Sequence, residues 1–229
     1  LRALDLPLEV LPGEQEARLG VLAVANGFAL DDAWVVDLGG GSAQISEMRD
    51  RQFAGGASYP LGAVRLTETY LSGERPTRAS IEALEAFLEE QLGPLLDSIR
   101  ADETPIVAMG GSIRNLARAV QVESSYPLDL VHNYRLHREP FEAIVAELIG
   151  MNATERARRF DINPDRADIL PAAALVFRHL LRRSGRSTLR LSGNGVREGA
   201  FFRIFLSAPH RLPDVTRFGI QNLAMQYSQ

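Results

Sequence analysis

Three glycine-rich turns contain residue types suited to holding phosphate. They are Asp37-Leu-Gly-Gly-Gly-Ser42, Met109-Gly-Gly-Ser112 and Ser192-Gly-Asn-Gly195, and each follows a short apolar segment. Glycine lets the backbone approach an anion closely, and consecutive N–H groups in such a turn form a concave site for phosphate oxygens. A single turn of this kind is more often a plain connection than a ligand site, so each turn alone is weak evidence.

The first turn gives the strongest signal. Asp37 ends an apolar segment immediately before Gly39, Gly40, Gly41 and Ser42. A carboxylate in this place can hold a hydrated Mg²⁺ against the same phosphate, or it can accept hydrogen bonds from the amides of its own turn. The chain has neither the Gly-Lys-Ser/Thr of a P-loop nor a complete dinucleotide-binding fingerprint. The turn therefore predicts a phosphate site of a different kind.

Composition limits the substrate and the partners. A formal net charge of −4 argues against broad electrostatic capture of nucleic acid, so an anionic substrate would need a local basic site. Arginines do gather in two segments, and the second group fits a solvated helix end. The first group is Arg156, Arg158, Arg159 and Arg166, and the second is Arg178, Arg182, Arg183 and Arg186.

Side chains for thiol or zinc chemistry are scarce. The chain has no cysteine, which rules out disulfides and is compatible with the bacterial cytoplasm, where we expect this protein. Its four histidines are scattered without a zinc motif, and His132 is expected to serve packing. No stretch approaches the roughly 20 apolar residues of a membrane span.

The elements that position the turns alternate between strands and helices, which predicts an α/β fold. Short β-rich segments such as 34–38 suit a covered sheet, and apolar residues at helical spacing mark amphipathic or buried helices. Strands are expected at 34–38, 43–48, 52–59, 105–109, 130–136 and 187–191, and helices at 14–28, 63–71, 80–100, 113–120, 139–149, 168–181, 196–206 and 215–227.

Five segments, taken in order, resemble the Ppx/GppA family of exopolyphosphatases and guanosine pentaphosphate phosphohydrolases. They are Leu11-Pro-Gly-Glu-Gln-Glu-Ala-Arg-Leu19, the turn at 37–42, Tyr59-Pro-Leu-Gly-Ala-Val-Arg-Leu-Thr67, the turn at 109–112 and Asn194-Gly-Val-Arg-Glu-Gly199. The resemblance implies the actin-like ATPase/sugar-kinase (ribonuclease H-like) fold, a duplicated α/β domain with its active site between the halves. It implies that this chain is mainly the second half.

The resemblance also implies an activity, the hydrolysis of the terminal phosphoanhydride of polyphosphate or guanosine pentaphosphate. Glu16 matches the family's catalytic glutamate, the general base for the attacking water. Residues Gly39 to Ser42 would hold the phosphate and Asp37 the divalent cation, most plausibly Mg²⁺. Arg166 would meet distal phosphates; an ion pair with Asp165 or Asp168 is an equal alternative.

The domain organisation follows from the same resemblance. Residues 1–13 are expected to be a remnant of the first domain or a linker, 14–208 the second actin-like domain, and 209–229 a linker and the start of a truncated helical third domain. The expected partners are the substrate and the missing N-terminal domain, with a homodimer as a further option. The fragment alone is expected to be inactive.

One departure from the family pattern lies two residues after the turn at 37–42, which is called the phosphate turn below. The family usually has Ser-Thr-Glu where this chain has Ser42-Ala43-Gln44. Gln44 carries no negative charge and accepts no proton, so a catalytically weak regulatory module that binds nucleotide or polyphosphate is the alternative function. A glutamine can still orient the attacking water by hydrogen bonds. A sugar kinase of the same fold is a third interpretation.

Overall fold

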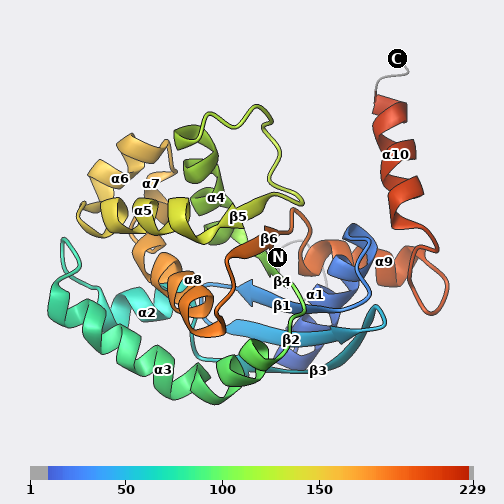
Figure 1. The fold of residues 1–229 in the computed structure, drawn as a ribbon, viewed down its shortest axis with the longest axis horizontal. Helices are drawn as coiled ribbons and strands as arrows, with labels where there is room; N and C mark the ends of the chain where they lie inside the picture. Colours follow the sequence, from blue (N-terminus) through green and yellow to red (C-terminus); the bar gives the residue numbers. More distant parts are fainter. Residues whose placement is uncertain (1–9, 227–229) are drawn as a thin grey trace, which may run out of the picture.

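The computed structural model describes residues 10–226, apart from the side chains of residues 164, 165 and 226, and it forms a six-stranded mixed sheet with helices on both faces (Figure 1). The strands are β1 (Ala33–Leu38), β2 (Ala43–Arg49), β3 (Gln52–Tyr59), β4 (Ile106–Met109), β5 (Arg135–His137) and β6 (Thr188–Leu191). The helices are α1 (Gly13–Gly27), α2 (Ala63–Tyr70), α3 (Arg78–Ala101), α4 (Gly111–Glu123), α5 (Arg138–Ile149), α6 (Ala153–Phe160), α7 (Pro164–Ala167), α8 (Leu170–Ser184), α9 (Val196–Phe205) and α10 (Val215–Gln226).

The strand order is β3-β2-β1-β4-β6-β5. Strands β1, β4 and β6 are parallel neighbours, whereas β2 and β3 form an antiparallel hairpin on one side and β5 pairs antiparallel with β6 on the other. Because parallel strands end at the same edge of a sheet, the turns that follow β1, β4 and β6 lie beside one another.

Both faces of the central strands are buried, as the apolar run at 34–38 predicts. Val35 and Val107 pack on one face with Val24 of α1 and with Phe28, which directly follows that helix. On the other face, alternate strand residues such as Val36 pack against the apolar stripes of the larger helical layer, which includes α3, α4, α5 and α8. The period-2 alternation of β1 therefore fixes α1, and with it Glu16, on one side of the sheet.

Helix α9 fixes α1 from outside the sheet. A Cβ atom at Gly199 would overlap the backbone of Leu19, so the two helices approach more closely than any larger residue would allow. Glu198 accepts a hydrogen bond from the Gly195 N–H at 2.7 Å and so caps the start of α9.

The hairpin of β2 and β3 confirms the sequence prediction with a turn shifted by one residue. Asp50 and Arg51 both have positive φ, 48° and 58°, which suits a two-residue turn of the type that matches strand twist. The expected strand at 130–136 is wrong in extent, because only Arg135–His137 pair with β6.

Two short helices, α6 and α7, have no counterpart in the sequence prediction. Helix α6 lacks an apolar stripe, and its cap at Asn152 and the buried Arg156 stabilise it instead. The Arg156 guanidinium donates to the carbonyl oxygens of Leu148, Ala167 and Met151, at 3.0, 3.1 and 2.5 Å, and so ties α5, α6 and α7 together.

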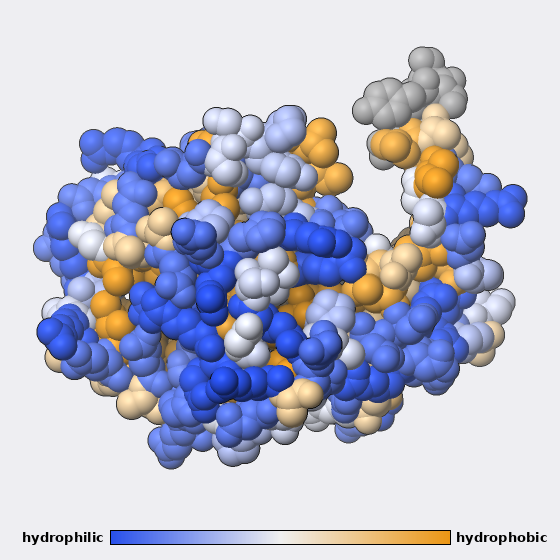
Figure 2. Space-filling view, viewed as in Figure 1, coloured by the Kyte–Doolittle hydropathy of each residue, from blue (hydrophilic) through white to orange (hydrophobic). Residues whose placement is uncertain are grey.

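Helix α10 projects away from the rest of the molecule (Figure 1). It carries the exposed apolar side chains of Ile220, Leu223 and Met225, and Figure 2 shows hydrophobic surface, in orange, on this projection. Residues 1–9 and 227–229, which include most of the expected N-terminal remnant and the end of the helix predicted at 215–227, lie outside the described residues. Among the described helices, none has the length and apolar character needed to cross a membrane.

Candidate functional site

The three glycine-rich turns meet at the carboxyl edge of the parallel strands. Gly110 has φ of 111°, and a Cβ there would lie 2.7 Å from the Leu38 carbonyl oxygen and 3.3 Å from Asp37 Oδ1. The Ser192 N–H donates to the Ala108 carbonyl oxygen at 2.8 Å. The turns that each gave weak evidence in the sequence therefore form one surface.

The N-terminus of α2 orients the first turn. The N–H groups of Ala63 and Val64 donate to the carbonyl oxygens of Gly39 and Gly40 at 2.9 and 3.0 Å, and Arg65 Nε donates to the Gly41 carbonyl at 3.0 Å. In a trans peptide the C=O points opposite to the next N–H. The N–H groups of residues 40, 41 and 42 consequently point away from α2.

The Gly39 amide does not belong to this set. Its N–H donates to the Ser42 carbonyl oxygen at 2.9 Å and closes the turn. The sequence analysis included Gly39 among the phosphate-binding amides, and the structure corrects this for its N–H. The donors left for an anion are the amides of Gly40, Gly41 and Ser42.

Glu16 and Gln44 face each other across the start of the turn. Gln44 Nε2 donates to Glu16 Oε2 at 3.0 Å, to Ser42 Oγ at 2.9 Å and, with a longer contact, to Ser58 Oγ at 3.3 Å. Glu16 stands in the first turn of α1, and Gln44 is buried in β2. One amide group thus joins the candidate base to the phosphate turn.

Asp37 is the most perturbed carboxylate of the site. Burial is the main cause that raises its pKa from 3.8 to about 6, the negative charge of Glu16 raises it further, and Arg114 opposes both effects. Two carboxylates that repel each other beside a row of amides suit a divalent cation. The described residues contain no cluster of three or more acidic or histidine ligands, so a cation here would take its remaining ligands from substrate and water.

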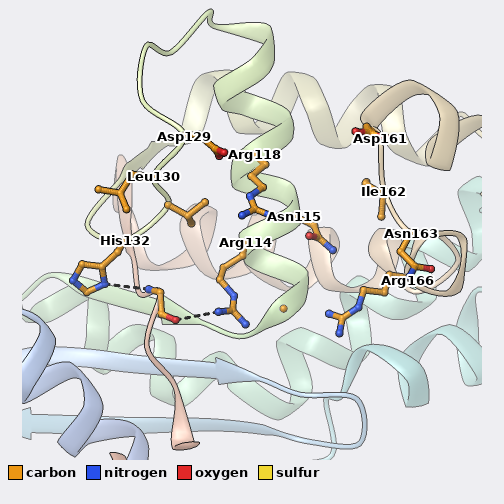
Figure 3. Close-up of a pocket in the computed structure, with 13 residues that line it drawn as sticks. Arg114, Asn115, Arg118, Asp129, Leu130, His132, Asp161, Ile162, Asn163 and Arg166 are labelled. Carbon is orange, nitrogen blue, oxygen red and sulfur yellow. Dashed lines mark hydrogen bonds between the residues drawn. The ribbon is translucent and has the colours of Figure 1, made fainter. Parts of the chain in front are cut away.

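Two hollows extend from the turn across the molecular surface. The first, about 540 Å³, is lined by Gly39, Gly40 and Ser112, and the second, about 560 Å³, by Arg114 and Arg118 of α4. Both share Gly111, Asn163 and Arg166. Together they form a continuous cleft, in which Arg166 of α7 and Arg114 of α4 reach toward each other (Figure 3).

The arginines of this cleft differ from the second arginine group. Arg178, Arg182 and Arg183 pair with Glu85, Glu142 and Glu89, and Arg178 is buried, so the solvated helix end expected for this group is wrong for Arg178. Arg114, Arg118 and Arg166 form no ion pair with any side chain that the structure describes. The three cleft arginines therefore keep donors for an anion.

The alternative role considered for Arg166 is partly settled. Among the described ion pairs there is none between Arg166 and Asp168, and the Asp165 side chain lies outside the described part of the chain. A Cβ at Gly111 would overlap the Arg166 guanidinium, so this arginine lies directly on the second glycine-rich turn.

Sequence reasoning missed Arg114 and Arg118, although a signal was present. They follow the turn at 109–112 and are four residues apart on one helix, so they lie on the same face. Gly62 was also missed: a Cβ there would overlap the backbone of Gly40 and Gly41, and only a glycine lets α2 approach the turn.

Comparison with known proteins identifies the family of the chain. Residues 2–208 match the family described as the Ppx/GppA phosphatase family. The chain is 29% identical over 198 residues to Exopolyphosphatase 2 of Mycobacterium tuberculosis, covering 83% of this chain and 62% of that protein. It is 30% identical over 200 residues to Exopolyphosphatase 1 of the same organism, covering 86% and 58%. The chain therefore spans less than two thirds of the length of these curated relatives.

Solved structures give the same result for the fold. The Ppx/GppA family member of Aquifex aeolicus superposes with a TM-score of 0.73 at 29% identity and covers 87% of this chain and 65% of its own. An exopolyphosphatase from Cytophaga hutchinsonii superposes with a TM-score of 0.81, over 89% and 67% of the two chains, and at 20% identity supports the fold alone. The actin-like ATPase fold expected from the sequence is confirmed.

Proposed function

This chain belongs to the Ppx/GppA phosphatase family, and we propose that the protein hydrolyses the terminal phosphoanhydride of polyphosphate. The observation that carries the proposal is the position of Glu16, whose carboxylate is held by Gln44 beside the phosphate turn. The relatives named exopolyphosphatase support the same reaction class.

In the proposed mechanism the phosphate turn holds the terminal phosphoryl group. The amides of Gly40, Gly41 and Ser42 bind its oxygens, and their fixed orientation favours the charge that develops during transfer. Glu16 accepts the proton of the attacking water as a general base. Gln44 orients the Glu16 carboxylate through one N–H of its side-chain amide and adds no charge of its own.

A divalent cation fits the site through Asp37. When bound, Mg²⁺ would neutralise negative charge on the substrate phosphates. The Asp37 carboxylate, with its pKa near 6, is ionised at neutral pH and available as a ligand. Binding of the cation would also relieve the repulsion between Asp37 and Glu16.

The cleft supports a phosphate chain as substrate. Arg114, Arg118 and Arg166 line the cleft in the direction that leads away from the phosphate turn, and arginine suits phosphate oxygens by charge and geometry. A polyphosphate chain would contact these side chains successively.

Guanosine pentaphosphate is the second candidate substrate. A further hollow, about 560 Å³, adjoins the cleft through Arg118, Asp129 and Asp161 and is lined by Tyr126 and Phe160. Aromatic side chains of this kind can stack on a base. The alternative of a regulatory module rests on Gln44, which replaces the usual glutamate.

The test is phosphate release by the full-length protein from polyphosphate and from guanosine pentaphosphate, each with Mg²⁺ and with EDTA. We expect Mg²⁺-dependent release from polyphosphate. Faster release from the nucleotide would assign the second substrate. Tight binding of either compound without any release would contradict hydrolysis and support the regulatory module.

A further inference from the structure

His132 is a half-buried side chain that the proposed mechanism does not use, although it borders the arginine-lined cleft. Its ring lies 4.7 Å from the ring of Phe28, measured between centroids. Both ring nitrogens are engaged: Nε2 lies 2.9 Å from the Gly27 carbonyl oxygen, and Nδ1 lies 3.2 Å from the Gly193 nitrogen.

These contacts define the tautomer. The Gly193 N–H can only donate, so Nδ1 must be the acceptor and carries no proton. Nε2 therefore bears the hydrogen and donates it to the Gly27 carbonyl. Burial, the main cause, and the nearby Arg190 lower the pKa of His132, while the Gly27 carbonyl raises it, so the neutral form agrees with its surroundings.

Gly193 connects His132 to the cleft. Its N–H is held by His132, and its carbonyl oxygen accepts a hydrogen bond from Arg114 Nη1 at 3.0 Å. Figure 3 shows the two bonds in series from His132 through Gly193 to Arg114. A Cβ at Gly193 would lie 3.1 Å from His132 Cβ, so the His132 side chain packs closely against this glycine.

The Gly193 carbonyl is the hydrogen-bond partner of the Arg114 side chain among the described residues, and no described carboxylate forms an ion pair with it. The orientation of Arg114 therefore depends on the position of the Gly193 peptide. A long side chain that is ordered before the ligand arrives loses less entropy on binding. Within the described part of the chain, the other N–H groups of its guanidinium have no hydrogen-bond acceptor and can donate to a phosphate oxygen.

We propose that His132 is a positioning residue that orients Arg114 through the Gly193 peptide and so sets the affinity of the cleft for a phosphate chain. This inference rests on the proposed function, because it takes the phosphate chain bound in the cleft to be the substrate. It assigns His132 to binding and not to the chemical step, so its loss should raise KM and leave kcat nearly unchanged.

Two substitutions separate this role from simple packing. His132→Asn keeps an acceptor near the place of Nδ1 and can still serve Gly193, whereas His132→Gln keeps a donor near the place of Nε2 and can still serve Gly27. We expect the Asn variant to have a KM within about 2-fold of wild type and the Gln variant to have a KM roughly 3- to 10-fold higher. A side chain that merely tied the loop to α1 through Gly27 would give the opposite order.

A double-mutant cycle tests the connection to Arg114. Arg114→Gln should raise KM about 10-fold or more, and His132→Phe should raise it roughly 3- to 10-fold in the wild-type background. Adding His132→Phe to Arg114→Gln should change KM no further, because the group that His132 positions is gone. His137→Phe, an exposed histidine in β5, is the control and should behave like wild type.

The assays use the full-length protein, with KM and kcat from phosphate release and affinity for inorganic tripolyphosphate from calorimetry. A wild-type protein that binds tripolyphosphate but releases no phosphate contradicts the proposed function alone, and the affinities still test His132. Three results would each overturn the inference. The KM effects of His132→Phe and Arg114→Gln could multiply in the double variant, or the Asn and Gln variants could have equal KM values. The third result is a wild-type protein that binds no tripolyphosphate. If the Phe variant does not fold, the Asn and Gln pair decides.

Discussion

At the scale of single residues, the contact between Gln44 and Glu16 determines how the site manages its charge. A glutamate at position 44 would face Glu16 with a second carboxylate, beside the already perturbed Asp37. The glutamine instead donates to Glu16 and Ser42. These hydrogen bonds hold the candidate base beside the phosphate turn.

The first prediction concerns Gln44→Glu. Without a divalent cation, the new carboxylate repels Glu16 and removes its hydrogen-bond donor, so the free energy of unfolding should fall by roughly 1–3 kcal/mol. Mg²⁺ should restore much of this loss and should become more strongly required for turnover. Urea denaturation and rate measurements across Mg²⁺ concentrations check both effects.

The matched control for this prediction is Gln52→Glu, the same change at an exposed position of β3. It should leave stability and metal dependence close to wild type. If Gln44→Glu behaves like this control, Gln44 is incidental to the site.

The second prediction concerns Asp37 and pH in metal-free buffer. Its folded-state pKa of about 6 lies above the ordinary 3.8, so the fold favours the protonated form. The stability that the fold gains by favouring protonated Asp37 is fully present below pH 4, and it is lost as the pH rises through 6. Above that pH the charged carboxylate destabilises the fold by roughly 3 kcal/mol.

Asp37→Asn stays neutral, so the variant should become more stable relative to wild type as the pH rises from 4 to 7, while it loses the carboxylate proposed to bind the cation. Denaturation of both proteins at several pH values measures the difference. A difference that does not change with pH would contradict the raised pKa.

At the scale of elements, helix α2 shapes the phosphate turn. Its N-terminal N–H groups bind the turn carbonyls, and Gly62 lets the helix approach. Gly62 has φ of −62°, so alanine is excluded by contact with the turn and not by backbone strain. A substitution at Gly62 therefore tests the contact between α2 and the turn without adding backbone strain.

The third prediction is that Gly62→Ala displaces the turn and lowers kcat/KM for polyphosphate by about 10-fold or more, since misplaced amides lose charge stabilisation. Circular dichroism should show that the fold persists. Gly55→Ala is the control, because nothing lies within 4 Å of a Cβ there. Equal activity of both variants would show that the turn tolerates the added methyl group.

The sequence predicts elements where apolar periodicity is strong. Helix α1 and strand β1 were expected within one or two residues because their buried faces leave a clear pattern. Helix α6 was missed because its main anchor, Arg156, acts through backbone carbonyls and leaves no apolar stripe. Strand β5 was overextended because pairing with an edge depends on the whole sheet.

The site was predictable where one motif carries it. The turn at 37–42 was predicted from its residues and Glu16 from the family resemblance, and in the structure Gln44 contacts both Glu16 and Ser42. The cleft arginines and the role of Gly193 were not, because α4, α7 and the turn after β6 are distant in sequence and meet only through the strand order. The engagement of the Gly39 amide depends on turn conformation, which side-chain identity does not specify.

At the scale of the whole molecule, the chain presents a cleft and an apolar surface. Phe201, Ile204 and Phe205 of α9 are exposed, as are Ile220 and Leu223 of α10. The curated relatives are longer than this chain, which covers 62% and 58% of two of them. We propose that a further domain of the same full-length chain completes the cleft; the homodimer and the third domain remain predictions.

The fourth prediction follows from this proposal. Residues 1–229 in isolation should fold but hydrolyse polyphosphate at least ~100-fold more slowly than the full-length protein. The reason is that one side of the cleft cannot orient the phosphate chain without the opposite domain. Circular dichroism and phosphate release measure the two properties. Comparable turnover by the isolated chain would show that these residues form the complete site.

The most direct test of the central claim is phosphate release by the full-length protein carrying Glu16→Gln, at saturating polyphosphate and Mg²⁺. Turnover should fall at least ~100-fold, the scale of losing a general base, with folding and tripolyphosphate affinity retained. Glu14→Gln is the control, since Glu14 pairs with Arg18 on the exposed face of α1 and should keep wild-type turnover. Wild-type turnover in Glu16→Gln would contradict the assignment of the base.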